Sequence, residues 1–490
     1  MPADATIPEL LRAAVAQHPD REAYVHGPAR ITYAQLGRMV DGFSRTLLNR
    51  GVRPGDVVML RLPSSIRFAA AYLGAIQVGA ITTALNGRLG PVEQQSIHDR
   101  TEPVLVLDPG HPILAKAFSA PPVRLDDLPT VLPNDPACIV WTSGTTGHPK
   151  GAVYDHLAQA AISRNIGQPT IDGERRLVVL PFAHVGFMTR MWDELAHGST
   201  VVVGGEPWNV AEHLRLIRDE RITMTVGVPT QWSLLLEHPD LAHTDFSRLR
   251  VAAVGGAGIP ADLVPRMRER LGCPVITRYT STEAGAVTST VIGDPDEVVS
   301  HTVGRPAPEV ELRVVGTEGE DVARGAIGEV ICRSPAMMRG YWKDPELTAE
   351  AIDADGFLHT GDLGRLTDDG YLQIVGRIKE MYIRGGYNVY PGEVNAVLAE
   401  HPAVAEVAVV GVPDPVMGEI GVAFVVLHEG RDAPTLDGLR ERVRTELADY
   451  KRPDRLVVVD EIPLTSMLKV DTHALRKRYL ADIPVPEETS

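Results

Sequence analysis

The sequence predicts an α/β fold in which a largely parallel sheet is covered by helices on both faces. Short, continuous apolar runs recur along the first two thirds of the chain, which is typical of strands buried on both sides. Segments with apolar residues at helical spacing lie between these runs, so strands and helices alternate. Further along, shorter strands separated by Gly and Asp predict a small antiparallel module.

Local signals define the first elements of this pattern. Thr32 and Gln35 form a capping box, the following apolar residues Leu36, Val40, Phe43 and Leu47 share one helix face, and Gly51 is expected to end the helix. A helix rich in small residues is predicted over 64–78. The predicted strands of this region are residues 57–62, 104–107, 177–180, 200–203, 251–254 and 275–277.

The pattern changes twice towards the C-terminus, which predicts two domains. Strands are expected at 328–332, 356–359 and 371–375 in the antiparallel module. Helices at 389–399 and 436–447 then alternate with strands at 404–410 and 422–427. We therefore expect a large N-terminal domain over 1–376, built of α/β subdomains and the antiparallel module, and a small mobile α+β domain over 377–490.

The composition excludes several functional classes. The 490 residues carry a formal net charge of −16, which disfavours extended nucleic-acid binding. The three cysteines, Cys138, Cys273 and Cys332, have neither metal-binding nor disulfide spacing, so a reducing, cytoplasmic location is expected. Neither a signal peptide nor an apolar run of membrane-spanning length is recognisable. The oligomeric state cannot be read from the sequence, and a homodimer stays open.

The strongest local signal is TSGTTGHPKG, from Thr142 to Gly151, which follows the apolar run 138–141. Four hydroxyl side chains and three glycines in ten residues are not typical of a regular element. The glycines let the backbone approach a ligand, and the hydroxyl groups, backbone N–H groups and Lys150 would hold the oxygens of a polyphosphate. It is not a Walker A loop, because Lys150 follows Pro149 and no Ser or Thr comes after it.

TSGTTGHPKG resembles the phosphate-binding signature of the adenylate-forming (AMP-binding) superfamily, which includes acyl-CoA synthetases, peptide adenylation domains and firefly-type luciferases. Other segments resemble further motifs of this family, in the family's order: GGAG from Gly255, YTSTE from Tyr279, HTGDLG from His359, GRIKEMYIRGG from Gly376 and PLTSMLK from Pro463. The matches cover nearly the whole chain and indicate a stand-alone acyl-CoA synthetase.

The resemblance implies a binding site for ATP and Mg²⁺. Tyr279 would stack on adenine, Asp362 and Arg377 would bind the ribose hydroxyls, Thr282 would contact the α-phosphate, and Glu283 would ligate Mg²⁺, for which a carboxylate oxygen is a suitable donor. Thr280 stands where the family usually has Gly. The whole nucleotide-binding set implied is Thr142, Ser143, Gly144, Thr145, Thr146, Gly147, Lys150, Gly255, Gly256, Ala257, Tyr279, Thr280, Thr282, Asp362, Ile374 and Arg377.

The resemblance also assigns roles in the small domain. Lys379 occupies the hinge position, and Gly385 and Gly386 belong to a loop that would line the tunnel for coenzyme A. Lys469 matches the lysine that enters the active site during adenylation. Leu468 replaces the usual Gly before it, and Leu adopts a positive φ only at a cost, so this departure affects how Lys469 would be presented.

A further part of the site concerns the acid. By resemblance, His184 is the gate beside the acyl pocket, and His184, Thr282, Glu283 and Lys469 form the catalytic set. Phe187, Val228 and Ala286 are mostly apolar or small candidates for the pocket lining. Arg190 could face a second carboxylate, although an external salt bridge is the simpler interpretation.

The expected function is ATP-dependent activation of a carboxylic acid as acyl-AMP, with release of pyrophosphate, followed by transfer to coenzyme A. One alternative is a stand-alone adenylase that passes the acyl group to a carrier protein or an amine. A second activates an inorganic acid such as nitrite for N–N bond formation. A non-catalytic nucleotide sensor would require Glu283 and the matching lysines to be incidental. The acid itself cannot be named from the sequence.

Overall fold

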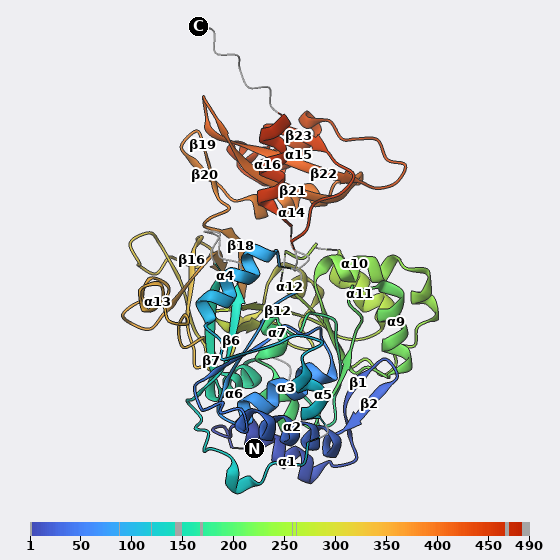
Figure 1. The fold of residues 1–490 in the computed structure, drawn as a ribbon. Helices are drawn as coiled ribbons and strands as arrows, with labels where there is room; N and C mark the ends of the chain where they lie inside the picture. The colour runs from blue at the N-terminus through green and yellow to red at the C-terminus, as the bar shows by residue number, and fades with distance from the viewer. Residues whose placement is uncertain are drawn as a thin grey trace.

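The computed structural model describes residues 2–87, 89–118, 120–142, 149–166, 170–256, 258–260, 262–465 and 470–482. In this part of the chain the strands form four sheets. A large body contains the first three sheets, and the end of the chain forms a smaller body above it (Figure 1). The predicted α/β class is confirmed.

A five-stranded sheet carries the ends of the glycine- and threonine-rich segment. Its order is β5-β3-β4-β6-β7, and its pairs are parallel except for the antiparallel β6–β7 hairpin. Thr142 pairs with Lys150 across this hairpin, so both ends of the segment lie side by side. The strands are β3 (Val57–Leu60), β4 (Ile81–Ala84), β5 (Leu105–Leu107), β6 (Pro136–Thr142) and β7 (Lys150–Asp155).

A nine-stranded sheet forms the second layer, in the order β14-β13-β12-β11-β10-β8-β9-β1-β2. Pairing is parallel from β12 to β1 and antiparallel at both edges. The strands are β1 (Glu22–His26), β2 (Ala29–Thr32), β8 (Arg175–Val178), β9 (Thr200–Val203), β10 (Met224–Gly227), β11 (Val251–Gly255), β12 (Val275–Ser281), β13 (Gly285–Ser289) and β14 (Arg305–Pro306).

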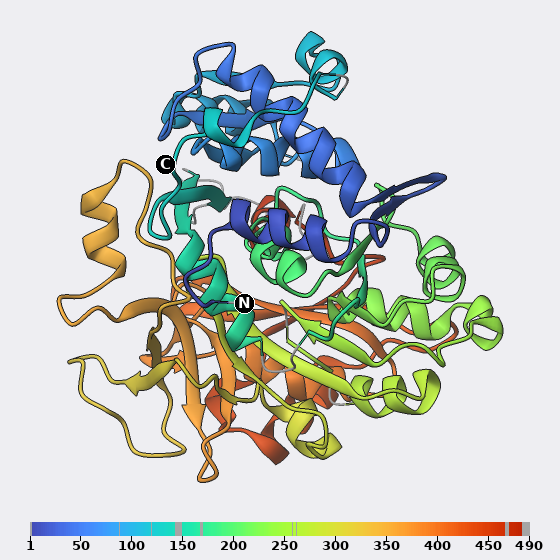
Figure 2. The same ribbon diagram turned by 90° about the horizontal axis from the view of Figure 1, so that it is seen from below.

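Helices cover these two sheets. In Figure 2 the blue N-terminal helices and the green helices α9 to α11 lie on different sides of the large body. The α-helices are α1 (Ile7–Gln17), α2 (Tyr33–Leu48), α3 (Ile66–Gln77), α4 (Pro91–Thr101), α5 (Pro112–Ala117), α6 (His156–Asn165), α7 (Val185–Met188), α8 (Met191–Ala196), α9 (Val210–Asp219), α10 (Pro229–Glu237), α11 (Leu263–Leu271) and α12 (Asp296–His301). Short 3₁₀ turns occupy Leu125–Asp127 and Pro239–His243.

The capping box predicted at the start of α2 is present. Gln35 N donates to Thr32 Oγ1 at 3.3 Å, and Thr32 N donates to Gln35 Oε1 at 2.7 Å. The predicted apolar stripe of this helix is completely buried. The helix ends at Leu48, however, and Gly51, with φ +81°, lies in the turn that follows.

A four-stranded antiparallel sheet completes the large body. Its order is β15-β16-β17-β18, as the predicted antiparallel module requires. Its elements are β15 (Glu311–Val315), β16 (Gly328–Arg333), α13 (Pro345–Ala351), β17 (Leu358–Leu366) and β18 (Leu372–Arg377).

The smaller body is an α+β unit around a long antiparallel pair, β21 and β22. The sheet order is β20-β19-β22-β21, and β23 adds to β22 in parallel. Its elements are β19 (Tyr382–Arg384), β20 (Tyr387–Val389), α14 (Pro391–Ala399), β21 (Val404–Asp414), β22 (Gly418–Leu427), α15 (Leu436–Glu446), a 3₁₀ turn (Asp449–Lys451), β23 (Arg455–Val458) and α16 (Thr472–Asp482). No helix in the described ranges is long and apolar enough to cross a membrane.

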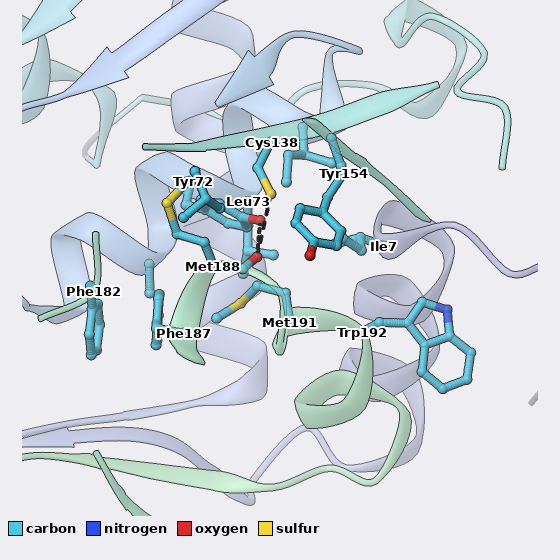
Figure 3. Close-up of a cluster of buried hydrophobic side chains, with 14 of the residues drawn as sticks. Ile7, Tyr72, Leu73, Cys138, Tyr154, Phe182, Phe187, Met188, Met191 and Trp192 are labelled. Carbon is cyan, nitrogen blue, oxygen red and sulfur yellow. Dashed lines mark hydrogen bonds between the residues drawn. The ribbon is translucent and has the colours of Figure 1, made fainter. Parts of the chain in front are cut away.

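One large hydrophobic cluster joins the two α/β layers (Figure 3). Phe182 and Phe187 stack with ring centroids 3.5 Å apart, and Phe68 of α3 meets both rings edge-on. The Tyr72 hydroxyl donates to the Met188 carbonyl at 2.5 Å, and the Cys138 thiol of β6 lies 3.8 Å from the same oxygen. The short helix α7 is therefore fixed against the strand that leads into the glycine- and threonine-rich segment.

Candidate functional site: a nucleotide site at the end of β12

Three side chains from two sheets meet near the carboxyl end of β12. The Tyr279 hydroxyl donates to Asp362 Oδ2 at 2.5 Å, and Arg377 Nε donates to Asp362 Oδ1 at 2.8 Å. Burial, together with the Asp362 carboxylate, raises the pKa of Tyr279 well above its ordinary value. The phenol therefore stays protonated and acts as the hydrogen-bond donor. The geometry brings together the residues that the sequence assigned to adenine and ribose.

Asp362 lies in a strand, so the prediction that it occupies a turn is wrong. The strand β17 continues through this position, and Asp362 pairs with Arg377 of β18. Gly361 has φ +69°, and the register shifts between Leu363 and Gly364, so the strand is irregular at this point. Cross-strand pairing therefore outweighs the turn preference of the flanking glycines, and it fixes the Asp362 carboxylate beside Tyr279.

A second group connects Glu283 with Lys150 through Tyr341. The Tyr341 hydroxyl donates to Glu283 Oε1 at 3.2 Å, and Lys150 Nζ lies 5.3 Å from the centre of the Tyr341 ring. Tyr341 is positioned because its segment runs along β7, with Trp342 N donating to the Gly151 carbonyl at 2.7 Å. The structure therefore brings a carboxylate and a cation from two different sheets to one place.

The turn that carries Thr282 and Glu283 is fixed by hydrogen bonds on both sides. Tyr154 Oη donates to the Thr282 carbonyl at 2.6 Å, and Met338 N donates to the Glu283 carbonyl at 2.9 Å. Within the turn, Ala284 N donates to Ser281 Oγ at 3.0 Å. The Glu283 side chain is half-buried, so its carboxylate is held at the edge of the site and stays accessible.

The remaining described nucleotide candidates surround β12. Gly255 pairs in register with Arg278, and Gly256, with φ +87°, has a backbone conformation that a larger residue would adopt only under strain. Thr280, where the family usually has Gly, is exposed and follows a register shift between Tyr279 and Thr280. Ile374 is half-buried on β18 opposite Gly364.

Residues predicted in the small domain lie on and near a hairpin. Gly385 and Gly386, with φ +57° and +85°, form the two-residue connection between β19 and β20, which suits glycine. Arg384, just before them, is buried and donates to both oxygens of Asp454, at 2.8 and 2.7 Å. Lys379 is exposed in the turn between β18 and β19.

The acyl-pocket candidates lie partly in the core. His184 is the N-cap of α7 and accepts a hydrogen bond from Gly186 N at 3.1 Å. Phe187 is fully buried against Phe182, and Val228 and Ala286 are also buried. Arg190 forms a salt bridge with Asp193 at 2.6 Å, as the simpler interpretation expected, but the pair is buried.

Several predicted residues lie outside the described residues, namely Ser143, Gly144, Thr145, Thr146, Gly147, Ala257, Leu468 and Lys469. Their roles stay predictions. In contrast, Tyr154 and Tyr341 contact the site but were missed in the sequence, because each lies far along the chain from the motif it contacts. The segment GYW around Tyr341 offered only one weak signal, an aromatic residue directly after a glycine.

The donor chemistry of this site fits Mg²⁺. Glu283 supplies one accessible carboxylate, and no group of three potential metal-binding side chains occurs in the described ranges. Mg²⁺ in nucleotide sites is commonly bound by one or two carboxylates, with phosphates and water as the other ligands. Glu283 could hold such an ion together with a nucleotide.

The fold and the site define a two-body α/β enzyme that binds a nucleotide. The profile described as "AMP-binding enzyme" matches residues 11–342, and the profile described as "AMP-binding enzyme C-terminal domain" matches residues 393–469. The chain therefore belongs to the family of AMP-binding enzymes, which confirms the resemblance seen in its motifs.

Relatives and solved structures extend over almost the whole chain. A feruloyl-CoA synthase of Amycolatopsis sp is 35% identical over 482 residues, which cover 94% of this chain and 96% of the relative. The amide bond synthetase McbA from Marinactinospora thermotolerans has a TM-score of 0.87 and 30% identity, with 97% and 100% coverage. ATP-bound MatB from Rhodopseudomonas palustris has a TM-score of 0.86 and 28% identity, with 98% and 99% coverage.

Proposed function

We propose that this chain activates a carboxylic acid as an acyl-adenylate, with release of pyrophosphate, and transfers the acyl group to coenzyme A. The observation that carries the proposal is the pairing of two groups around β12: Tyr279 with Asp362 and Arg377, and Glu283 with Tyr341 and Lys150. The first suits a nucleoside and the second suits phosphates. Similarity to a feruloyl-CoA synthase and to an ATP-bound protein supports both substrates.

In this proposal the nucleoside is bound by Tyr279, Asp362 and Arg377. The Asp362 carboxylate has lone pairs left after it accepts from Tyr279 and Arg377, so it can also accept from two ribose hydroxyls. The adenine would lie against the Tyr279 ring and the backbone of Gly255 to Ala257, with Ile374 on another side. Because these partners are fixed before ATP binds, little reorganisation is needed on binding.

The phosphates would be bound by the segment from Thr142 to Gly147, by Lys150 and by Thr282. A Mg²⁺ ion held by Glu283 would neutralise phosphate charge when it is bound. The acid carboxylate attacks the α-phosphorus and pyrophosphate leaves, which converts a poor leaving group on the acid into AMP, a good one. Lys469 would offset the negative charge that builds up where the two anions meet.

The second half-reaction needs a different arrangement of the small domain. A thiol attacks the acyl carbon and AMP leaves, so Lys469 must give way to the thiol. We place the domain boundary at residues 376 and 377 and the hinge at the exposed turn of Lys379. The Gly385–Gly386 hairpin would then approach the bound acid, with His184 as the gate for the acyl group.

The amine-accepting alternative has one observation in its favour, the 30% identity to an amide bond synthetase over 97% of this chain. A carrier protein or an inorganic acid such as nitrite stays open in the same way. Cytoplasmic location is part of the proposal, because all three cysteines are buried and free. Whether two copies of the chain associate is not part of it.

A pyrophosphate-release assay with ATP and a panel of acids tests the activation step. Adding coenzyme A, an amine or nitrite in turn then identifies the acceptor from the product formed. Thioester formation coupled to AMP supports the proposal. Amide formation with no thioester would favour the alternative, and absence of pyrophosphate release with every acid would contradict both.

A further inference from the structure

A group of charged side chains is buried between β8 and α8, on the acyl side of the nucleotide site. The Asp193 carboxylate accepts from Arg190 Nη2 at 2.6 Å and from Arg176 Nη2 at 3.1 Å. Arg176 Nη2 also donates to Glu174 Oε2 at 3.2 Å, and Arg250 donates to the other oxygen of Glu174. Buried charges are costly unless they are paired, and these residues satisfy one another.

Arg278 reaches the same region from β12, but it has no ion-pair partner among the residues that the structure describes. Its Nε and Nη2 atoms are cut off from solvent and have no hydrogen-bond partner there. Burial, with Arg190 and Arg176 nearby, lowers the pKa of Arg278 to about 9, which leaves the guanidinium protonated at neutral pH. A buried cation without a partner is unfavourable, so this position would gain from an anion.

The carboxylates of the cluster do not compensate Arg278. Asp193 and Glu174 each already accept hydrogen bonds from two other arginines. The third acid of the cluster, Glu194, lies 3.7 Å from Arg176, and burial raises its pKa to about 7. With Arg250 included, four guanidinium groups face three carboxyl groups, so the cluster has an excess of positive charge and Arg278 is the one left unpaired.

The position of Arg278 relates this excess charge to the acid. Successive residues of a strand point to opposite faces, so the Arg278 side chain points away from the Tyr279 side chain. Arg278 pairs in register with Gly255, and Arg190 lies two residues after the end of α7, whose N-cap is His184. The guanidinium therefore lies on the face of β12 that is turned towards the segment expected to gate the acyl group.

We propose that Arg278 binds a second carboxylate of the acid, so that dicarboxylic acids are the preferred substrates. This inference rests on the proposed function. Nε and Nη2 lie on one edge of the guanidinium and match the two oxygens of a carboxylate. A second carboxylate there would satisfy both unpartnered donors and neutralise the excess charge, while the first carboxylate reacts with ATP.

The test measures pyrophosphate release with unbranched dicarboxylic acids of increasing length, each compared with its half-amide and with the monocarboxylic acid of equal length. The wild-type chain should prefer the best dicarboxylic acid over both analogues by roughly 10- to 100-fold in kcat/KM. Arg278→Met should abolish this preference, and Arg278→Lys should retain part of it. Arg53→Met, which changes an exposed arginine far from the site, should behave as wild type.

Thermal unfolding supplies a readout that does not depend on activity. Because Arg278 is unpaired, Arg278→Met should melt at the same temperature as the wild-type chain or higher, and the dicarboxylic acid should raise the melting temperature of the wild-type chain alone. A preference that survives in Arg278→Met, equal use of acid and half-amide, or a sharply lower melting temperature of both Arg278 variants would overturn the inference. Absence of pyrophosphate release with every acid would instead contradict the proposed function on which it rests.

Discussion

The Tyr279 hydroxyl donates a hydrogen bond of 2.5 Å to Asp362 Oδ2, and this bond joins the nine-stranded sheet to the four-stranded sheet. Arg377 holds the other oxygen of the same carboxylate at 2.8 Å. Asp362 is thus fixed from two sides, and its remaining lone pairs are directed by a rigid frame. A ligand that bonds to Asp362 would find its acceptor already oriented.

We expect Asp362→Asn to weaken ATP binding, because an amide accepts the ribose hydroxyls less strongly and presents an N–H group to Arg377. The KM for ATP should rise by roughly 10- to 100-fold, the range of a lost hydrogen bond to a charged group. The kcat for pyrophosphate release should change less. Asp369→Asn, at an exposed position in the following turn, is the matched control. An unchanged KM for ATP in Asp362→Asn would refute the ribose assignment.

Glu283→Gln keeps the shape of the side chain and removes the charge assigned to Mg²⁺. Adenylation should fall by roughly 10²–10³-fold, the scale of losing one major electrostatic element. Tyr341→Phe, which removes only the hydroxyl that bonds to Glu283 Oε1, should have a smaller effect. The measurement is pyrophosphate release over a range of Mg²⁺ concentrations, with exposed Glu318→Gln as control. A wild-type rate of Glu283→Gln at saturating Mg²⁺ would exclude the assignment.

The two lysines should separate the half-reactions. Lys469→Ala should reduce acyl-AMP formation by about 10²–10³-fold, because its charge is needed only while carboxylate meets phosphate. It should leave thioester formation from synthetic acyl-AMP nearly intact, whereas Lys150→Ala should weaken ATP use through lost pyrophosphate contacts. Single-turnover thioester formation is the measurement. If Lys469→Ala loses both steps equally, Lys469 has another role, and if it loses neither, another cation replaces it.

Glu194 should make stability depend on pH. Burial outweighs the attraction of Arg176 and Arg190 and raises the pKa of Glu194 from 4.5 to about 7. Between these values the unfolded chain releases the proton and the folded chain retains it, so the free energy of unfolding falls as the pH rises. Below this window the contribution is fully present, and above it the contribution is lost.

Denaturant unfolding of the wild-type chain and of Glu194→Gln, at about pH 5 and about pH 8, measures this effect. The stability of the wild-type chain relative to Glu194→Gln should drop over this interval, by an amount on the order of a few kcal/mol. Glu318→Gln should show no such change. A relative stability that is constant, or that rises with pH, would show that Glu194 is ionised in the folded protein.

Local sequence signals predicted much of the fold, because capping and apolar periodicity act over a few residues. The cap of α2 at Thr32 and its buried stripe are present as expected. The strand predicted at 177–180 instead runs over Arg175–Val178, since the buried charge of Arg176 is compensated by Asp193, which is distant in sequence. Only tertiary pairing could reveal that an arginine belongs to a buried strand.

The same distinction holds for the candidate site. Motif residues such as Tyr279 and Asp362 were recognisable from their segments, and the structure brings them together. Tyr341 and the unpaired Arg278 were not recognisable, because their significance depends on what lies across the sheet from them. The strand conformation of Asp362 was missed for this reason too, since it depends on pairing with Arg377.

The most direct test of the central claim is the stoichiometry of a single reaction mixture that contains the protein, ATP, Mg²⁺, an accepted acid and coenzyme A. Acyl-CoA, AMP and pyrophosphate should appear in equal amounts, and omitting the acid should stop all three. Formation of ADP and phosphate in place of AMP and pyrophosphate would contradict activation through an acyl-adenylate. AMP and pyrophosphate without acyl-CoA would contradict the transfer to coenzyme A.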